Sequence, residues 1–330
     1  MARVVQFDQV GGPEVLKVVD VAVRPPKEGE IRINVKAIGL NRAESMFRSG
    51  NYVVGPTLPN AGIGYEAAGL VESIGEGVTG FSIGDAVSVI PAFMMNDYAM
   101  YGEQVVAPAF AVVKHPHNLS WEEAAATWMQ YATVYGALIE IANLAEGDFL
   151  LIPAASSSVG LAAIQLANMV GAIPVALTRG ENKREQLLEA GARHVIVTST
   201  QDVETEVHQI TEGRGARVVF DPVGGPMFQK LVKAASVNGI LIAYGALSTE
   251  ATPLPFLHVL GKLLTIRGYQ LFELTMDKVA IERVKAFILD GLASGKLKPV
   301  VGKTFPLENV VEAHQYMESN QQFGKIVLTT

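Results

Sequence analysis

The residues FLLIPAASSSVGLAAIQLANMVGAIPVALTR, numbered 149–179, decide the fold that we predict for this chain. No charged residue stands between Asp148 and Arg179. A membrane span needs a similar run, of about 20 apolar residues. Here, however, Pro153, the serines 156–158 and Pro174 divide the run into a β-rich piece, a polar turn, a helical piece and a second β-rich piece. That order predicts a strand, helix and strand of the kind that binds nucleotides.

The segments after Gly147 continue this alternation. Strand-like LLIP, PVAL, HVIV, RVVFD and GILIAY alternate with helical stretches near 161–170, 181–190 and 202–211 and one that begins at 227. Such alternation predicts a parallel sheet with helices on both faces. The stretch 263–271, LLTIRGYQL, predicts an added edge strand, and two subunits often join at such a strand.

The first third of the chain has a different character. Short β-type runs punctuated by Gly and Pro fill residues 3–107 and predict a compact, mostly antiparallel barrel. Ser120 and Glu123 then form the signature of a capping box before a helical stretch at 121–144. A long helix over 276–294 and short strands near 300–305 and 324–329 return towards the first domain.

Length and composition narrow the function classes. A chain of 330 residues exceeds the usual single core, so two domains are expected. The net charge of -7, with no basic run, argues against a nucleic-acid or polybasic membrane surface. The absence of cysteine excludes disulfides, thiolate nucleophiles, iron–sulfur clusters and cysteine-bound zinc. The N-terminus lacks a basic-then-apolar signal pattern, so we expect a cytoplasmic protein.

The turn at 154–160, AASSSVG, is the candidate phosphate site. Backbone amides and the dipole at a helix N-terminus attract phosphate. The usual dinucleotide fingerprint has three glycines, and only Gly160 is present here. Serines are small and carry hydroxyls that donate to phosphate oxygens, so we expect Ser157 and Ser158 to contact the phosphates. An ordinary helix cap is the alternative explanation of this turn.

The second strand of the unit indicates the type of cofactor. An NAD site places an acidic residue about 20 positions after the glycines. This strand instead ends at Thr178 and Arg179, and Lys183 and Arg184 follow. Cationic donors without an acid favour NADPH, which carries a 2′-phosphate. The alternative is that these basic residues form a solvated helix face.

Several motifs together resemble a known family. They are IGLNRAE at 38–44, GYEAAGLVESIGEGV at 64–78, ATVYGAL at 132–138, DPVGG at 221–225 and a closing GKIVL. The chain resembles the medium-chain dehydrogenase/reductase superfamily from end to end. Within it, the chain is most similar to the zinc-independent quinone oxidoreductases, the zeta-crystallin-like branch. The resemblance implies an α/β protein with a GroES-like β-barrel catalytic domain, residues 1–124 and 267–330, and a doubly wound Rossmann sheet, residues 125–266.

The resemblance also bears on metal. Zinc alcohol dehydrogenases of the superfamily hold catalytic zinc at the positions of Asn41, Tyr65 and Met129, and these residues are not ordinary zinc ligands. We therefore expect no metal, so that hydrogen-bond donors must polarise the substrate. Conjugated carbonyls suit this chemistry, because hydride adds to the far carbon and donors stabilise the enolate oxygen. For quinones, a two-electron and a one-electron route both stay open.

Residue roles carried over from the family complete the predicted site. Asn41 would face the nicotinamide and Tyr52 would face the substrate as the oxygen-side donor, although Tyr52 could instead simply pack on Phe47. Thr133 would bind the nicotinamide ribose or the amide side of the ring. One departure is Thr198, where related NADPH enzymes often have a tyrosine. The cofactor set is Asn41, Thr133, Ser156, Ser157, Ser158, Val159, Gly160, Thr178, Arg179, Lys183, Val223, Gly245, Leu271 and Phe323.

These observations predict an NADPH-dependent, metal-free reductase of quinones or α,β-unsaturated carbonyls. Its partners would be a small-molecule substrate and a second copy of the chain, joined through 263–271, without nucleic acid or membrane. One alternative is a non-catalytic NADPH-binding protein of structural or regulatory type, as crystallins of this branch suggest. A zinc alcohol dehydrogenase is a further alternative, which bound zinc would reveal.

Overall fold

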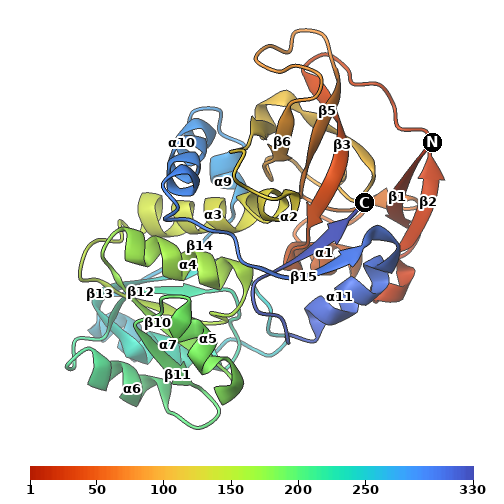
Figure 1. Cartoon of the computed structure of the whole chain (residues 1–330). Coiled ribbons are helices and arrows are strands. Elements are labelled where there is room, and N and C mark those ends of the chain that lie inside the picture. The colour runs from red at the N-terminus through yellow and green to blue at the C-terminus, as the bar shows by residue number, and fades with distance from the viewer. The chain divides into compact units, whose positions relative to one another are not determined.

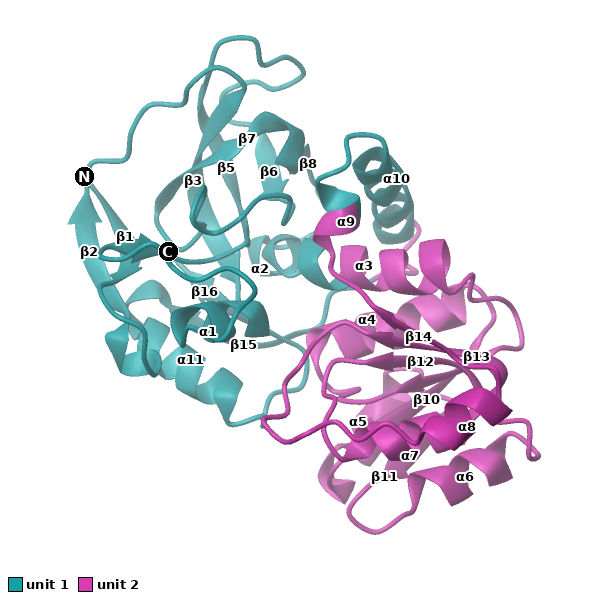
Figure 2. Cartoon of the chain, turned by 180° about the vertical axis from the view of Figure 1, so that it is seen from behind, with its two compact units in different colours: residues 1–130, 274–293, 298–330 teal, residues 131–273, 294–297 magenta.

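The computed structural model describes residues 1–330. By its internal contacts the chain divides into two compact units, coloured separately in Figure 2. Unit 1 comprises residues 1–130, 274–293 and 298–330, and unit 2 comprises residues 131–273 and 294–297. The predicted boundaries, at 124/125 and 266/267, fall six and seven residues before these divisions, and residues 294–297, predicted in the catalytic domain, group with unit 2.

Unit 1 is built on a mostly antiparallel sheet of seven strands, as the sequence predicts. The order is β15-β16-β3-β5-β6-β8, and β7 also pairs with β3. The strands are β3 (Glu30–Gly39), β5 (Glu66–Ile74), β6 (Ala86–Val89), β7 (Gln104–Pro108), β8 (Val112–Lys114), β15 (Val301–Pro306) and β16 (Lys325–Thr329). Three more form a separate small sheet: β1 (Ala2–Phe7), β2 (Lys17–Val21) and β4 (Ala61–Gly62).

Strand β3 is where distant parts of the chain meet. Its first half pairs with β7, and residues 37–39 pair antiparallel with Val327–Thr329 of β16. In Figure 1 the blue C-terminal strand accordingly runs beside the red β3. A cluster of small side chains, Ala37, Ala68 and Ala124–Ala126, lets helix α2 (Trp121–Ala125) approach this sheet closely. The other helices of unit 1 are α1 (Arg42–Arg48), α10 (Ala280–Ala293) and α11 (Val310–Glu318).

Unit 2 contains a parallel sheet of six strands in the order β11-β10-β9-β12-β13-β14. The strands are β9 (Phe149–Ile152), β10 (Ile173–Thr178), β11 (His194–Val197), β12 (Ala216–Asp221), β13 (Ala235–Ala243) and β14 (Thr265–Gly268). The helices that follow β9 in this unit are α4 (Ser158–Met169), α5 (Arg184–Glu189), α6 (Val203–Ile210), α7 (Met227–Ala234) and α8 (Phe256–Gly261). The predicted strand–helix–strand unit over 149–179 and the edge strand within 263–271 are confirmed.

The core of unit 2 follows from the side-chain alternation of its strands. Leu151, Val175 and Val219 point to one face and pack with side chains of α6 and α7 in one buried cluster. Helix α4 packs on β9 and β10 and contributes nothing to that cluster. Figure 2 shows α4 and α6 on opposite sides of the strands. Helices therefore cover both faces, as predicted for a doubly wound sheet.

Two predicted helices differ in detail. The stretch 121–144 contains α2, then α3 (Trp128–Val134), then a π-helical segment, Tyr135–Ile141. The predicted helix over 276–294 begins later, at Ala280, and a short helix α9 (Phe272–Thr275) precedes it. None of the helices is both long enough and apolar enough to cross a membrane.

Candidate functional site

Asn41 stands at the junction of β3 and α1 in unit 1. Its backbone is extended, and its N–H donates to Glu44 Oε2 at 2.7 Å, three residues along the chain. Its side-chain Nδ2 donates to Glu44 Oε1 at 3.0 Å. Asn41 thereby begins α1, and the carboxylate of the first helical turn holds both its main chain and its side chain.

A buried ion pair fixes the other end of the Asn41 side chain. Strand β16 places Lys325 Nζ against Glu66 Oε1 and 2.6 Å from Asn41 Oδ1. The side chains of Lys325 and Glu66 are only 0% and 1% exposed. Glu66 Oε2 accepts the backbone N–H of Met129 at 2.9 Å. Both ends of the Asn41 amide therefore bond to side chains of unit 1, so that Asn41 is suited to hold neighbouring residues in position.

Glu44 is the node of this network. Its carboxyl is fully buried and receives four donors: Asn41 N, Asn41 Nδ2, the Tyr65 N–H at 3.1 Å and the Tyr101 hydroxyl at 2.6 Å. Burial raises the pKa of Glu44 to about 7, against the effect of these hydrogen bonds. The carboxyl is thus held in place by two of the three residues at the family's zinc positions, Asn41 and Tyr65.

The network extends from Tyr101 to the surface of unit 1. Tyr101 Oη lies 3.3 Å from His314 Nε2, and His314 Nδ1 lies 2.9 Å from Arg48 Nη1. Because a guanidinium cannot accept, Nδ1 must accept and Nε2 carries the proton that is donated to Tyr101. Burial, and then the charge of Arg48, lowers the pKa of His314 to about 3, so its ring is neutral. Arg48 also pairs with Glu318 at 2.6 Å.

Tyr52 lies after α1, between two aromatic rings. Its ring meets Phe47 edge-on, with centroids 6.4 Å apart, and Tyr65 at 6.5 Å. The Tyr65 hydroxyl donates to the Tyr52 oxygen at 3.3 Å. The packing on Phe47 that the sequence offers as an alternative therefore occurs, and it occurs together with a polar contact on the hydroxyl.

The predicted phosphate turn lies in unit 2, between β9 and α4. Ser157 caps α4, its Oγ accepting the Gly160 N–H at 3.1 Å. Ser158 and Val159 are the first helical residues, so their N–H groups belong to the first turn, where such groups lack helical partners. A Cβ on Gly160 would lie 2.6 Å from backbone atoms of Ala155, so only glycine allows this close approach of helix and loop.

Basic side chains gather beside this turn. Thr178 ends β10, and Lys183 Nζ donates to Ser156 Oγ at 3.1 Å, which joins the two loops. Burial, and then the neighbouring charge of Arg179, lowers the pKa of Lys183. Two cations next to a helix N-terminus suit an anionic group such as a phosphate. The structure thus joins Lys183 to the serine turn, and Arg179 lies close enough for its charge to act on Lys183.

The remaining predicted residues of unit 2 follow other strands. Val223 comes after β12, and its N–H donates to Asp221 Oδ1 at 2.9 Å. Gly245 comes after β13 and lies against the carbonyl of Pro222. Because carboxyl ends of parallel strands share one edge of the sheet, Val223 and Gly245 belong to the same edge as the serine turn. Leu271 is buried between β14 and α9.

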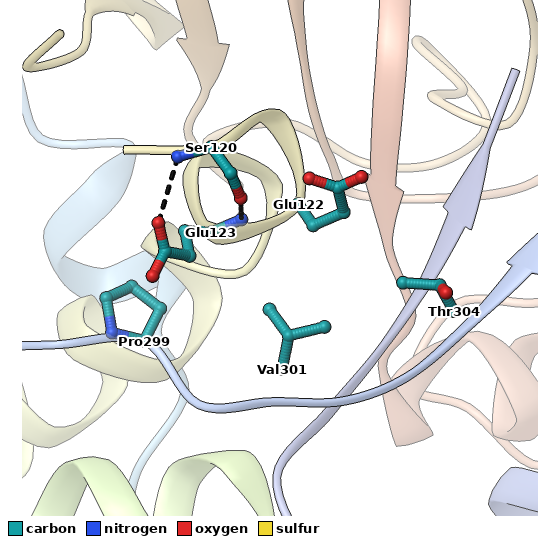
Figure 3. A pocket seen from close by; sticks show the side chains of 6 residues that line it. All are labelled: Ser120, Glu122, Glu123, Pro299, Val301 and Thr304. Atoms are coloured by element: carbon teal, nitrogen blue, oxygen red, sulfur yellow. Dashed lines mark hydrogen bonds between the residues drawn. The ribbon is translucent and has the colours of Figure 1, made fainter. Parts of the chain in front are cut away.

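The last two predicted residues lie on other elements. Thr133 is buried on α3, and Phe323 precedes β16 in unit 1. No group of three or more His, Asp or Glu side chains is arranged to hold a metal ion. A hollow of about 440 Å³ in unit 1 is lined by Ser120, Glu122, Glu123, Pro299, Val301 and Thr304 (Figure 3). None of the predicted site residues lines it, and Ser120 and Glu123 bond to each other there in the capping box.

Models of two known protein domains match this chain, one mostly within unit 1 and one mostly within unit 2. Residues 27–151 match the alcohol dehydrogenase GroES-like domain, and residues 158–286 match the zinc-binding dehydrogenase model. Quinone oxidoreductase 1 of Escherichia coli is 32% identical over 99% of this chain and 99% of its own length. The chain belongs to the quinone oxidoreductase branch of the medium-chain dehydrogenase/reductase superfamily.

One more curated relative and one solved structure show the same similarity over the whole chain. A 2-haloacrylate reductase of Burkholderia is 31% identical over 96% of both chains. The crystal structure of the Escherichia coli quinone oxidoreductase complexed with NADPH is 29% identical, with a TM-score of 0.91 and complete coverage of both chains. The fold expected from the sequence, a GroES-like domain with a Rossmann-type parallel sheet, is thus confirmed for this chain.

Sequence reasoning missed most of the network around Asn41. The pattern Asn41-Arg-Ala-Glu44 is a helix-start signature and could have identified the Asn41–Glu44 contact. No local signal connects Asn41 to Lys325, because 284 positions separate them. The hydroxyl contact of Tyr65 was likewise not predicted, since a buried tyrosine at that position is equally compatible with packing alone.

Proposed function

We propose that the protein is an NADPH-dependent reductase of quinones or α,β-unsaturated carbonyls that works without a metal. Its relatives' names support a reductase of this kind, one of them acting on a quinone and another on a haloacrylate. The NADPH complex of the Escherichia coli enzyme supports the choice of cofactor. A cytoplasmic location stays a prediction.

The observation that carries this proposal is the composition of the network around Asn41. At the three family positions for zinc ligands, Asn41 and Tyr65 are tied to Glu44, and the Met129 N–H is tied to Glu66. Lys325 and the Asn41 amide are committed to this network. Tyr52 is predicted to face the substrate, and its hydroxyl accepts a hydrogen bond from Tyr65 without using its own proton.

The serine turn and its basic neighbours fit a dinucleotide phosphate. We infer that the N–H groups at the start of α4 and the Ser156–Ser158 turn hold the pyrophosphate, and that Arg179 and Lys183 hold the 2′-phosphate. The glycine at 160 keeps this cradle open, because a side chain would collide with Ala155. When bound, NADPH would supply a hydride.

The residues of unit 1 would handle the substrate oxygen. Burial raises the pKa of Tyr52, so its phenol stays protonated at neutral pH and acts as a donor. Its hydroxyl would bond the oxygen on which negative charge develops and then give that oxygen its proton. Asn41, held by Glu44 and Lys325, would keep α1 and the start of the Tyr52 loop in place.

A turnover assay tests the proposal directly. Purified protein is mixed with NADPH and a panel of quinones, enones, enals and haloacrylates, and nicotinamide absorbance is followed. We expect oxidation of NADPH with at least one of these classes and full activity after treatment with a chelator. Tight NADPH binding without turnover on any substrate would indicate the non-catalytic alternative instead, and stoichiometric zinc would indicate an alcohol dehydrogenase.

We also propose that two copies of the chain associate through the edge of the unit 2 sheet. Strand β14 has a neighbour on one side only. Around it Leu257 and Leu263 are 81% and 68% exposed, and further exposed apolar side chains are Leu254, Phe256, Leu260 and Ile266. An unpaired edge with this much apolar surface is costly in water, and a second copy would cover it.

A further inference from the structure

Tyr65 holds a position where the family's alcohol dehydrogenases place a metal ligand, and it contacts the residue predicted to meet the substrate. It is the second residue of the GYEAAG motif, directly before β5, and its side chain is fully buried. Its backbone N–H is fixed by Glu44 and its ring packs on Tyr52 and Phe93. Both the main chain and the ring of Tyr65 are thus held in place.

The hydroxyl of Tyr65 is aimed at Tyr52. The two oxygens lie 3.3 Å apart, and both rings are fixed, Tyr52 by Phe47 on its other side. Tyr65 is the donor in this hydrogen bond and the Tyr52 oxygen is the acceptor, which lowers the desolvation cost of burying the Tyr65 hydroxyl. Tyr52 is the more exposed of the two, and its own proton is then directed away from Tyr65.

We propose that Tyr65 is a positioning residue for the reduction, acting through Tyr52 by orienting its hydroxyl and stabilising its phenolate. This inference rests on the proposed function of Tyr52. When hydride adds to the far carbon of the conjugated carbonyl, an electron pair moves onto the substrate oxygen. That oxygen then takes the proton of Tyr52 Oη, so the O–H bond of Tyr52 breaks and an O–H bond forms on the substrate. The phenolate left behind accepts the Tyr65 hydrogen bond until water returns a proton.

The electrostatics of the pair agree with this direction of donation. Burial raises the pKa of Tyr52, and the hydrogen bond from Tyr65 opposes that rise. For Tyr65 burial also raises the pKa, and its contact with Tyr52 adds to the effect. Tyr65 is therefore the weaker acid of the two and stays a donor while Tyr52 exchanges its proton.

The test is a double-mutant cycle. Tyr65→Phe, Tyr52→Phe and the double variant are compared with wild type for kcat and KM on an enone at saturating NADPH. Tyr316→Phe, which removes a tyrosine hydroxyl on α11, is the matched control and should retain wild-type rates. We expect Tyr52→Phe to lower kcat by about 100-fold and Tyr65→Phe by about 5- to 20-fold, with KM changed by less than about threefold.

The decisive result is the double variant. If Tyr65 acts through Tyr52, adding Tyr65→Phe to Tyr52→Phe lowers kcat no further than about twofold. Losses that multiply would assign Tyr65 a separate, structural role and overturn the inference, as would a fully active Tyr65→Phe beside an impaired Tyr52→Phe. Unimpaired Tyr52→Phe would remove the proposed donor itself, and no turnover by wild type would remove the proposed function.

A pH profile gives a second readout that packing alone would not change. Activity on the enone should fall at alkaline pH as Tyr52 ionises. Removing the Tyr65 hydrogen bond makes that ionisation harder, so the alkaline limb of kcat should move to higher pH in Tyr65→Phe, by a few tenths to about one pH unit. An unmoved limb would contradict the inference even if kcat fell. Thermal unfolding of each variant confirms that it is folded.

Discussion

At the scale of single residues, Arg179 and Lys183 are the side chains that we propose for the 2′-phosphate of NADPH. Both are cationic, and Lys183 is partly buried and bonded to the serine turn, whereas Arg179 stands at the end of β10. A phosphate between them would relieve their mutual repulsion. We therefore assign Arg179 to the 2′-phosphate, which NADPH has and NADH lacks.

Replacing Arg179 by alanine should separate the two cofactors. A charge-assisted hydrogen bond contributes about 1.5 to 3 kcal/mol, so the Kd for NADPH should rise by about 10- to 100-fold. The Kd for NADH should change by less than about threefold. Isothermal titration of both cofactors measures this, with Arg193→Ala, an exposed arginine of the same unit, as the control. Equal losses for both cofactors would refute the assignment.

Glu44 should make the stability of unit 1 depend on pH near neutrality. Its pKa is about 7 in the folded chain against an ordinary value of 4.5, because burial disfavours the carboxylate, while Tyr101 and Lys325 oppose this. The folded state therefore binds the proton more tightly than the unfolded state. The resulting stabilisation is complete below pH 4.5 and is lost as the pH rises through 7.

The Glu44→Gln variant should remove that slope. Between pH 5 and pH 8 the free energy of unfolding of wild type should fall by about 2 to 3 kcal/mol relative to the variant. Denaturant unfolding at several pH values measures the difference, and a constant offset between the two proteins does not affect it. Parallel curves for wild type and variant would show that Glu44 keeps one protonation state throughout this range.

How far residue roles follow from sequence depends on the distance between partners. Asn41 and Tyr52 could be proposed from a family resemblance, and the capping pattern connects Asn41 to Glu44. Lys325 could not be proposed, because its contact with Asn41 exists only when β16 pairs with β3. The Tyr52–Tyr65 contact also escapes prediction, since it depends on the rotamers of two rings.

Among the elements, helix α4 and its serine turn are the best predicted. The turn and the following strand stand where the sequence places them, whereas α4 begins at Ser158, three residues before the predicted start near 161. The ordinary helix cap, which the sequence offers as the alternative, is present at Ser157. The breaks within the helical stretch at 121–144 could not be predicted, because its composition favours helix throughout. The break between α2 and α3 coincides with Thr127, whose hydroxyl bonds the Glu123 carbonyl at 2.8 Å and so competes with the helical backbone.

Gly160→Ala should test the close approach of α4 to its preceding loop. The new Cβ would meet backbone atoms of Ala155 at 2.6 Å, so the start of α4 must shift. We expect a loss of about 1 to 3 kcal/mol in the binding of NADPH and NADH alike, since both share the pyrophosphate. Gly261→Ala, on α8 with open space around it, is the matched control. Selective loss of NADPH alone would contradict the predicted seat of the pyrophosphate.

At the scale of the whole molecule, the edge of the unit 2 sheet is the surface that we propose for association of two copies. If two copies join along β14, a charge there should separate them. We expect wild type to elute as a dimer and Leu257→Asp combined with Leu263→Asp to elute as a monomer, measured by light scattering at micromolar concentration. Ile83→Asp, at an exposed apolar position of unit 1, should leave the dimer intact. A monomeric wild type would rule out this interface.

The pairing of β16 with β3 has a consequence for how the chain is made. A ribosome completes all of unit 2, residues 131–273 and 294–297, before it reaches Lys325. Until then β3 lacks its neighbour at residues 37–39, and Glu66 and Asn41 lack their cation. The nascent chain can therefore finish its second unit while its first still has an open sheet edge. The unit that is translated first would be the one that matures last.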